Sequence, residues 1–255
     1  MRGLALRVLL GLAILFDVAL LASSHWFDDL SLVREWANRQ DEYSEAFGEH
    51  IRLVLSALVL AVAIGVPLGL AATTSATRSG RIFTVLSLVQ TIPSIALFGL
   101  LIGPLTALSQ AAPALREIGI RGIGFTPALI ALTLYGLLPI ARNTETGVKG
   151  VPAAAIDAAR GMGMTALQIT TRVSLPLALP TLLAGLRIVT VQLVGLTVVA
   201  ALIGAGGFGS FVFLGLGQTA TDLVLLGALS AIVLALVADA ALRLLTLAAT
   251  RAFTA

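Results

Sequence analysis

Long runs of apolar residues constrain the fold of this chain more than any other feature. Six segments stand out, and each is long enough, or nearly so, to cross about 30 Å of hydrocarbon as a helix. They are residues 4–22, 53–72, 82–108, 127–141, 177–203 and 223–249. Only 11% of the 255 residues are charged, whereas soluble domains are about one quarter charged. The sequence therefore predicts an all-α, polytopic membrane protein with about six transmembrane helices.

The first apolar segment has two interpretations. Arg2 and Arg7, the apolar run and the sequence Ala22-Ser23-Ser24 resemble a signal peptide with its cleavage site. The run is, however, longer than the core of about 7 to 15 apolar residues that is typical of a signal peptide. We favour a retained first span, because an even number of spans also agrees with the distribution of charge.

Basic residues are distributed unequally between the two predicted sides of the membrane. With six spans and an inner N-terminus, the inner side holds eleven of the sixteen Lys and Arg residues: Arg2, Arg7, Arg78, Arg81, Arg142, Lys149, Arg160, Arg172, Arg187, Arg243 and Arg251. The outer side holds Arg34, Arg39, Arg52, Arg116 and Arg121. The positive-inside rule then predicts that both termini are cytoplasmic. The scattered basic residues form no stripe, so we expect no nucleic-acid partner.

The sequence offers little material for catalysis. Its only lysine, Lys149, does not belong to a Gly-Lys-Ser/Thr phosphate loop, so this chain is not expected to bind ATP in that way. Its two histidines, His25 and His50, form no HExxH pair, and we interpret both as solvated or interfacial residues. Cysteine is absent, and so is a GxSxG nucleophile motif. We therefore predict a protein that is not an enzyme and has no catalytic residues, metal site or bound cofactor.

The long inner segment, about 142–176, is predicted to form two short helices joined by a bend. Pro152 suits the first position of a helix, and Gly163 can adopt the positive φ of a helix C-cap. Thr165 and Gln168 match a capping box, so the second helix is expected to begin at Thr165. Pro176 disfavours a helical conformation of the residue before it and is expected to end that helix.

The bend is predicted to present small or adaptable apolar side chains, those of Ala158, Ala159, Met162, Met164 and Leu167. Exposed apolar residues beside arginines suit a knob that fits a groove on a partner protein. The alternative is an amphipathic loop that lies on the membrane surface. Spacing and caps alone do not separate these two interpretations.

The same segment resembles the membrane subunits of ABC-type importers. Their pattern is Glu-Ala-Ala, three residues, Gly, nine residues and Ile-x-Leu-Pro, and this chain has Asp157-Ala158-Ala159, Gly163 and Val173-Ser174-Leu175-Pro176. Asp replaces Glu and Val replaces Ile. The stretches LTLYGLLPIARNTETGVKGV and ALIGAGGFG are also similar to permeases of the osmoprotectant group, which import glycine betaine, choline or related quaternary amines. The resemblance extends from about residue 44 to the C-terminus.

This resemblance implies a type I ABC importer permease fold in the bacterial inner membrane. It implies one permease domain over residues 1–255: a first span and acidic outer segment in 1–50, a core region in 51–255, and a cytoplasmic coupling loop in about 142–176. The implied partners are cytoplasmic ABC ATPase subunits that use ATP and Mg, a second permease copy or a paralogue, and an extracytoplasmic substrate-binding protein. The implied ATPase-coupling residues are Asp157, Ala158, Ala159, Gly161, Met162, Gly163, Met164, Leu175 and Pro176.

Polar side chains inside the spans, together with one helix-perturbing proline, are candidates for a translocation path. They are Gln90, Thr91, Pro93 and Ser94 in the third span, Tyr135 in the fourth, and Gln192 and Thr197 in the fifth. The alternative is that these residues form hydrogen bonds that hold the helices together. The chain has only 2 Trp, 2 Tyr and 10 Phe, and aromatic faces are what bind a quaternary ammonium. We therefore expect solute selectivity to lie mainly in the binding protein.

Two other functions stay open at this stage. Ionisable residues within spans mark the ion pathways of secondary carriers, and this chain has Asp17, Arg187 and Asp239. They would serve an ion-coupled carrier for a small solute, or they are interhelical structural charges. An ABC permease for a different small solute, such as an amino acid, is the other alternative.

Overall fold

A computed structural model describes residues 31–117 and 119–254, which form helices joined by short connections. The elements are α2 (Ser31–Asn38), α3 (Gln40–Thr73), α4 (Ala76–Thr91), α5 (Ser94–Ala111), α6 (Pro113–Glu117), α7 (Phe125–Lys149), α8 (Ala153–Gly161), α9 (Ala166–Ile169), the π-helix η2 (Thr170–Ser174), α10 (Leu175–Ala200), the 3₁₀-helix η3 (Ala201–Ile203), α11 (Gly209–Gln218) and α12 (Thr221–Thr254). The predicted first span, which contains Asp17, lies outside the described residues, and so does His25 of the outer segment.

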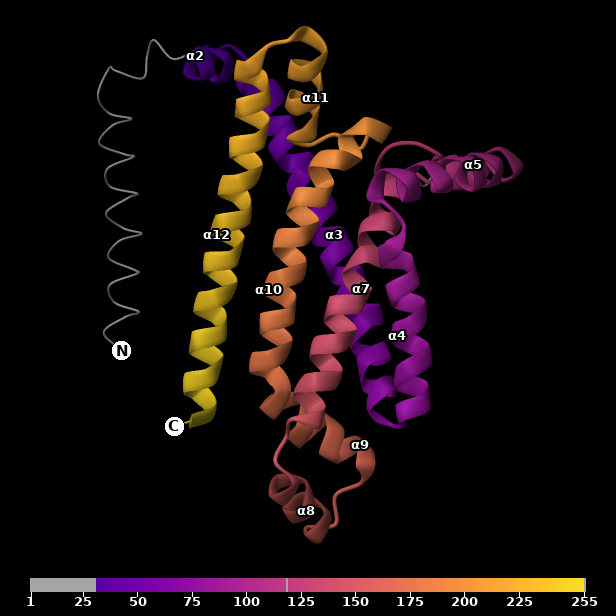
Figure 1. Ribbon diagram of the computed structural model, residues 1–255, viewed down its shortest axis with the longest axis vertical. Coiled ribbons are helices and arrows are strands. Elements are labelled where there is room, and N and C mark those ends of the chain that lie inside the picture. Colours follow the sequence, from indigo (N-terminus) through magenta and orange to yellow (C-terminus); the bar gives the residue numbers. More distant parts are fainter. Residues whose placement is uncertain (1–30, 118, 255) are drawn as a thin grey trace.

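The long helices form a bundle that confirms the all-α membrane architecture. In Figure 1, α3, α4, α7, α10 and α12 run along the long axis, and α8 and α9 project from one end, here called the elbow end. The opposite end carries α2, α5 and α11. Five helical segments within the described residues are long and apolar enough to cross a membrane: Gln40–Thr73, Ser94–Ala111, Phe125–Lys149, Ala166–Ile203 and Thr221–Leu247.

The predicted third span, residues 82–108, is not one continuous helix. Helix α4 ends at Thr91, and Ile92 has an extended backbone with φ −72° and ψ 125°. This conformation is the one that a residue before proline prefers, because the ring of Pro93 crowds the α conformation of Ile92. Helix α5 then begins at Ser94 and turns across the end of the bundle opposite the elbow (Figure 1).

Small residues let α3 and α7 approach each other closely. Gly65 of α3 faces the side chain of Ile140, and Gly69 faces Thr144 and the carbonyl of Ala141. Without side chains at these two glycines, the two helix backbones gain dispersion contacts along their length, which is the main source of helix association in lipid. Helix α7 packs against α3, α4, α5 and α10, so it lies at the centre of the bundle.

An ion pair joins α10 to α12. The Arg187 guanidinium donates from Nε to Oδ1 of Asp239 at 2.9 Å and from its terminal nitrogen to Oδ2 at 2.8 Å. Such a two-point contact fixes the relative orientation of the two side chains. Arg187 and Asp239 were candidates either for an ion pathway or for a structural contact between helices. The structure shows the structural contact for this pair.

We expect Gly69→Ala to destabilise the bundle and Gly48→Ala not to. A Cβ at Gly69 would lie 2.6 Å from the Ala141 carbonyl, whereas a Cβ at Gly48, in the same helix, meets nothing within 4 Å. Overpacking of this kind costs about 1–3 kcal/mol, while Gly→Ala in an unobstructed helix gains about 0.5–1 kcal/mol. Thermal unfolding of the purified protein in detergent measures the difference, and equal Tm values for the two variants would contradict the close contact.

Candidate functional site

The elbow, formed by α8, the bend at residues 162–165 and α9, projects beyond the ends of the long helices (Figure 1). Pro152 is the N-cap of α8, so the helix begins at Ala153, one residue later than predicted. At the other end of α8, the Met164 N–H donates to the Ala159 carbonyl at 3.1 Å. Gly163 has a φ of +78°. The predicted glycine C-cap is therefore confirmed.

The second helix of the elbow starts with a complete capping box, as predicted. The Thr165 N–H donates to Oε1 of Gln168 at 2.8 Å, and the Gln168 N–H donates to Oγ1 of Thr165 at 3.4 Å. These two bonds satisfy backbone donors that would otherwise have no partner at a helix start. A single residue, Met164, therefore separates the glycine C-cap of α8 from the capping box that starts α9.

Pro176 does not end the second helix, and that prediction is wrong. The chain passes from α9 through the π-helical segment Thr170–Ser174 directly into α10, and Leu175 is helical with φ −64° and ψ −45°. The Leu175 N–H donates five residues back, to the Thr170 carbonyl. A proline ring normally clashes with the carbonyl four residues before it. The wider π turn before Pro176 relieves this clash, so the helix continues into the membrane span.

The elbow exposes two large apolar side chains at its tip. Met162 is 74% exposed and Leu167 is 73% exposed, and Ala158, Gly161 and Gly163 are exposed beside them. Asp157 is also exposed and pairs with Arg160 at 3.3 Å. Ala159 is only 1% exposed and packs inside the elbow, so the prediction that it is presented to a partner is wrong. Met164 is half-buried, as are Leu175 and Pro176.

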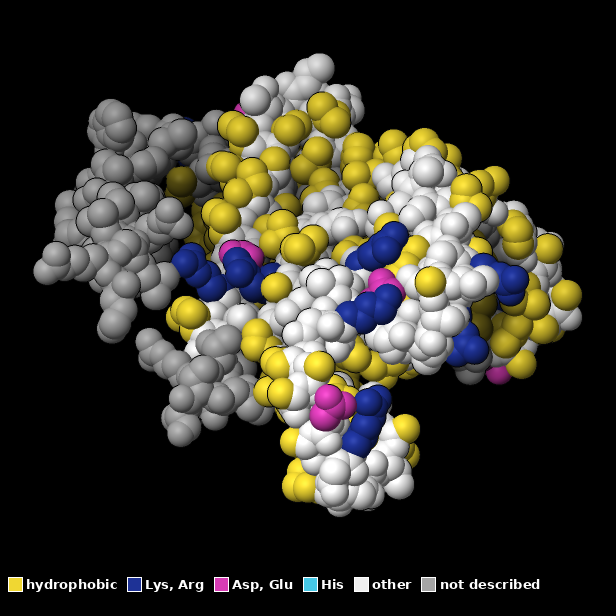
Figure 2. All heavy atoms as spheres, turned by 60° about the horizontal axis from the view of Figure 1, so that its bottom comes forward, with side chains coloured by type: hydrophobic (Ala, Val, Ile, Leu, Met, Phe, Trp, Pro, Cys, Tyr) yellow, Lys and Arg dark blue, Asp and Glu magenta, His cyan; other side chains and the backbone are white. Residues whose placement is uncertain are grey.

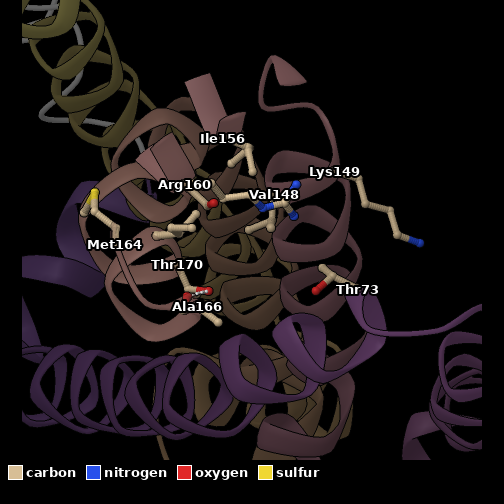
Figure 3. Close-up of a pocket in the computed structure, with 10 residues that line it drawn as sticks. Thr73, Val148, Lys149, Ile156, Arg160, Met164, Ala166 and Thr170 are labelled. Carbon is tan, nitrogen blue, oxygen red and sulfur yellow. Dashed lines mark hydrogen bonds between the residues drawn. The ribbon is translucent and has the colours of Figure 1, made fainter. Parts of the chain in front are cut away.

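A hollow of about 470 Å³ separates the elbow from the end of the bundle. It is lined by residues of α3, α7, α8, α9 and η2, and Figure 3 shows Arg160 reaching across it toward Val148 while Lys149 points away. Thr170 donates its hydroxyl to the Ala166 carbonyl at 3.0 Å, the contact dashed in the figure. The elbow is thus held by its two chain connections and stands clear of the bundle on this side.

A polar cluster that the sequence analysis missed fastens α7 just before the elbow. Ser79 and Lys149 both donate to Oε1 of the buried Glu145, each at 2.7 Å. The Arg142 guanidinium lies 3.7 Å from the ring centroid of Phe83, a cation–π contact. The spacing Glu145–Lys149 is a recognisable i,i+4 helix pair. The contact with Ser79 of α4 has no local sequence signal.

Basic side chains are spread over the elbow end, which Figure 2 turns toward the viewer. Arg78 and Arg81 lie in the first turns of α4, Arg142 and Lys149 in the last turns of α7, and Arg172 in η2. All of these belong to the predicted inner set. The C-terminal end of α12 lies toward the same end of the molecule (Figure 1).

Three of the predicted path residues meet at the break between α4 and α5. Gln90 donates from Nε2 to the Tyr135 carbonyl at 3.0 Å, and the Tyr135 hydroxyl donates to the carbonyl of Ile92, next to Pro93. These bonds hold the break against α7, as the interhelical alternative predicts. The break is thus supported by a helix distant in the sequence.

Of the other predicted path residues, Thr91 and Ser94 flank the same break, whereas Gln192 and Thr197 lie in α10. Thr197 is fully buried and donates to the Leu193 carbonyl of its own helix at 2.8 Å, so it lines no passage in this conformation. Thr91 is exposed, and Ser94 and Gln192 are half-buried. For these three residues the path assignment stays a prediction.

His50 is fully buried, so its interpretation as a solvated or interfacial residue is wrong. Its Nδ1 accepts from the Phe208 N–H at 3.3 Å, and its Nε2 lies 3.2 Å from the Val194 carbonyl. A carbonyl only accepts, so Nε2 carries the hydrogen. The neighbouring Glu49 accepts from the Gly207 N–H at 2.9 Å.

The turn at residues 204–207 is fixed by these contacts and by its glycines. Gly206 and Gly207 have φ values of +76° and +80°, and a Cβ on Gly206 would collide with the Glu49 carboxylate. Positive φ and close approach both require glycine here. The structure thus shows a turn tied to α3 through Glu49 and His50.

Comparison with known proteins places most of the chain in one group. The model of the family "Binding-protein-dependent transport system inner membrane component" matches residues 61–250. The osmoprotectant import permease protein OsmW of Salmonella typhimurium is 41% identical over 191 residues, 75% of this chain and 84% of that protein. The glycine betaine/carnitine/choline transport system permease protein OpuCB of Bacillus subtilis is 36% identical over 192 residues, 75% of this chain and 81% of that protein.

A solved structure shares the fold. A chain of the MetNI methionine ABC transporter in an inward-facing conformation superposes with a TM-score of 0.70 at 25% identity, covering 83% of this chain and 98% of that chain. The match leaves part of the present chain without a counterpart in that structure.

We expect Thr165→Ala to open the elbow and Thr165→Ser to leave it closed. Loss of an N-cap side chain costs about 1 kcal/mol, which is about a fivefold increase in the locally opened population. Serine retains the accepting hydroxyl. The rate of trypsin cleavage after Arg160 and Arg172 in the folded protein measures this opening, and equal rates for wild type and Thr165→Ala would contradict a role of the capping box.

Proposed function

The chain belongs to the family of binding-protein-dependent transport system inner membrane components, and we propose that it forms the translocation path of an ATP-driven importer for quaternary-amine osmoprotectants. Residues 61–250, which match the family, include four of the five long apolar segments in full or in large part and the whole elbow. In this proposal, a separate ATPase hydrolyses ATP with Mg and moves the permease between inward- and outward-facing states.

The exposed elbow is the observation that carries the coupling part of this proposal. Met162 and Leu167 expose most of their surface on a bend whose geometry is fixed by Gly163 and the capping box. Large exposed apolar side chains on a rigid, protruding segment favour a protein partner. A loop that lay flat on a membrane would instead spread its apolar residues along one face.

The elbow end faces the cytoplasm in this proposal. The inner set of basic residues gathers there, including Arg78, Arg142, Lys149 and Arg172, and the positive-inside rule favours the cytoplasmic side for such an end. The elbow then meets cytoplasmic ATPase subunits, and the end with α2, α5 and α11 faces an extracytoplasmic binding protein. A second copy of this chain, or a related permease, completes the path.

The substrate class rests on the relatives. Curated permeases named for glycine betaine, carnitine, choline and osmoprotectant transport are 31–41% identical to this chain. The methionine transporter shares the fold at lower identity. An ion-coupled carrier is less well supported, because the Asp239 carboxylate is already engaged by Arg187.

We expect ATP-dependent uptake of a quaternary amine by the assembled transporter. The chain is purified with the ATPase that accompanies it and reconstituted in liposomes with its binding protein. Radiolabelled glycine betaine, choline and carnitine are compared with methionine, with and without internal ATP. Uptake of methionine alone would overturn the substrate class, and gradient-driven uptake without ATP would overturn the importer mechanism.

We expect Gly163→Val to uncouple transport and Gly163→Asn to preserve most of it. No atom crowds this position, so the effect of a side chain is conformational. A left-handed conformation costs about 1–2 kcal/mol for an ordinary residue, and asparagine tolerates it better than a β-branched residue does. Substrate-stimulated ATP hydrolysis and uptake are measured in the same liposomes. Normal coupling in Gly163→Val would show that the geometry of the bend is not used.

A further inference from the structure

An apolar groove of about 440 Å³ runs along the bundle surface between α3 and α12. Its walls are formed mainly by Tyr43, Phe47 and Ile51 of α3 and by Leu229, Val233 and Val237 of α12. Phe47, Leu229, Val233 and Val237 are 43–61% exposed. Between Leu226 and Val237 the α12 wall extends about 16 Å at 1.5 Å per residue, which matches three turns of a packed helix.

The chain enters the described structure beside this groove. Ser31 begins α2, which contacts α12 and leads directly into α3, so the preceding residues arrive next to both walls. Figure 1 shows α2 at the end of α12 and α3. The apolar segment 4–22 has 19 residues and would span about 28 Å as a helix. Eight residues, 23–30, connect it to α2, and even fully extended they reach no more than about 28 Å.

We propose that residues 4–22 form a transmembrane helix that packs in the groove between α3 and α12 of the same chain. The short connection restricts this segment to the neighbourhood of α2. The groove is a hollow in that neighbourhood with a mainly apolar lining, and four of its apolar side chains are exposed. Filling it removes the gap between α3 and α12 and gains the dispersion contacts that hold helices together in lipid.

A polar pair inside the groove sets the register. The hydroxyls of Tyr43 and Ser230 lie 3.0 Å apart, and either one can donate to the other. The two groups have two hydrogens and use one between them, so the second is free for an acceptor. Asp17 is the acidic residue of the apolar segment, and a carboxyl group within a membrane needs such a partner.

The depth of this pair is consistent with the register. Asp17 lies five residues from the end of the segment that leads to α2, and Tyr43 lies in the first turn of α3. Both are therefore near the end of the bundle opposite the elbow. With Asp17 on the groove, Ala13 lies one turn deeper on the same face, and Leu15 points about 160° away from Ala13 at 100° per residue.

Disulfide cross-linking tests the proposal in a chain that has no cysteine of its own. Ala13→Cys is combined with Val233→Cys, which lies about one turn deeper than Ser230. The matched control is Leu15→Cys with Val233→Cys, since Leu15 lies on the opposite face and differs from Ala13 by only about 3 Å along the helix axis. A protease site placed in the connection between α6 and α7 cuts the chain, so the two fragments stay together only when a disulfide links them.

The full-length protein is oxidised in native membranes together with its partners. We expect the Ala13/Val233 pair to cross-link within one chain and the Leu15/Val233 pair to remain largely free. In a second experiment, the two cysteines of each pair are placed in two different copies of the chain, which carry different tags and are co-expressed. A cross-link between copies would show that a second copy fills the groove and would overturn the proposal.

Two further outcomes also decide the question. A mature chain that begins near Ser23 by N-terminal sequencing would show that residues 4–22 are removed, and the proposal would be wrong. Equal cross-linking of both pairs, or of neither pair in a protein that still assembles, would show that the segment does not pack in this groove. The test needs no transport, so its failure is distinct from a failure of the proposed function.

Discussion

The close contact between α3 and α7 is the interaction on which the rest of the structure depends. Helices in lipid gain little from excluding water, so they associate through backbone approach and side-chain packing. Gly65 and Gly69 allow that approach. Helix α7 then carries the support for the α4–α5 break at Tyr135 and, about one turn before its end, the Glu145 cluster. The elbow follows α7 directly in the chain. Its position therefore depends on the packing of α7 against α3.

Local signals in the sequence predicted local structure well. The C-cap at Gly163 and the capping box of Thr165 and Gln168 depend on a few consecutive residues, and both are confirmed. Pro176 was predicted incorrectly because the outcome depends on whether the preceding turn can widen, which the preference of the residue before proline does not reveal. Ile92 shows the other outcome, since there the chain follows that preference and the helix ends.

Long-range contacts explain most of what the sequence could not predict. From the sequence, His50 was assigned to the outer segment, but the turn after η3 packs against it and buries it. Glu145 accepts a hydrogen bond from Ser79 of α4, a contact that no sequence spacing predicts. Gln90 and Tyr135 were candidates for a path, but their hydrogen bonds hold a helix break. A polar side chain in a span can form a hydrogen bond with a backbone group that lacks a partner in its own helix. Such bonds are favourable because an unpaired backbone group is costly in lipid.

The continuity of the helix through Pro176 has a mechanical consequence. Residues 166–203 form one helical segment of 38 residues, about 57 Å long at 1.5 Å per residue. One end of this segment joins the elbow, and the other leads into the glycine turn held by Glu49 and His50. A tilt of about 5° displaces the far end by about 5 Å over that length. In the proposed importer, a tilt imposed at the elbow would therefore move the hydrogen-bonded turn at the opposite end of this helix.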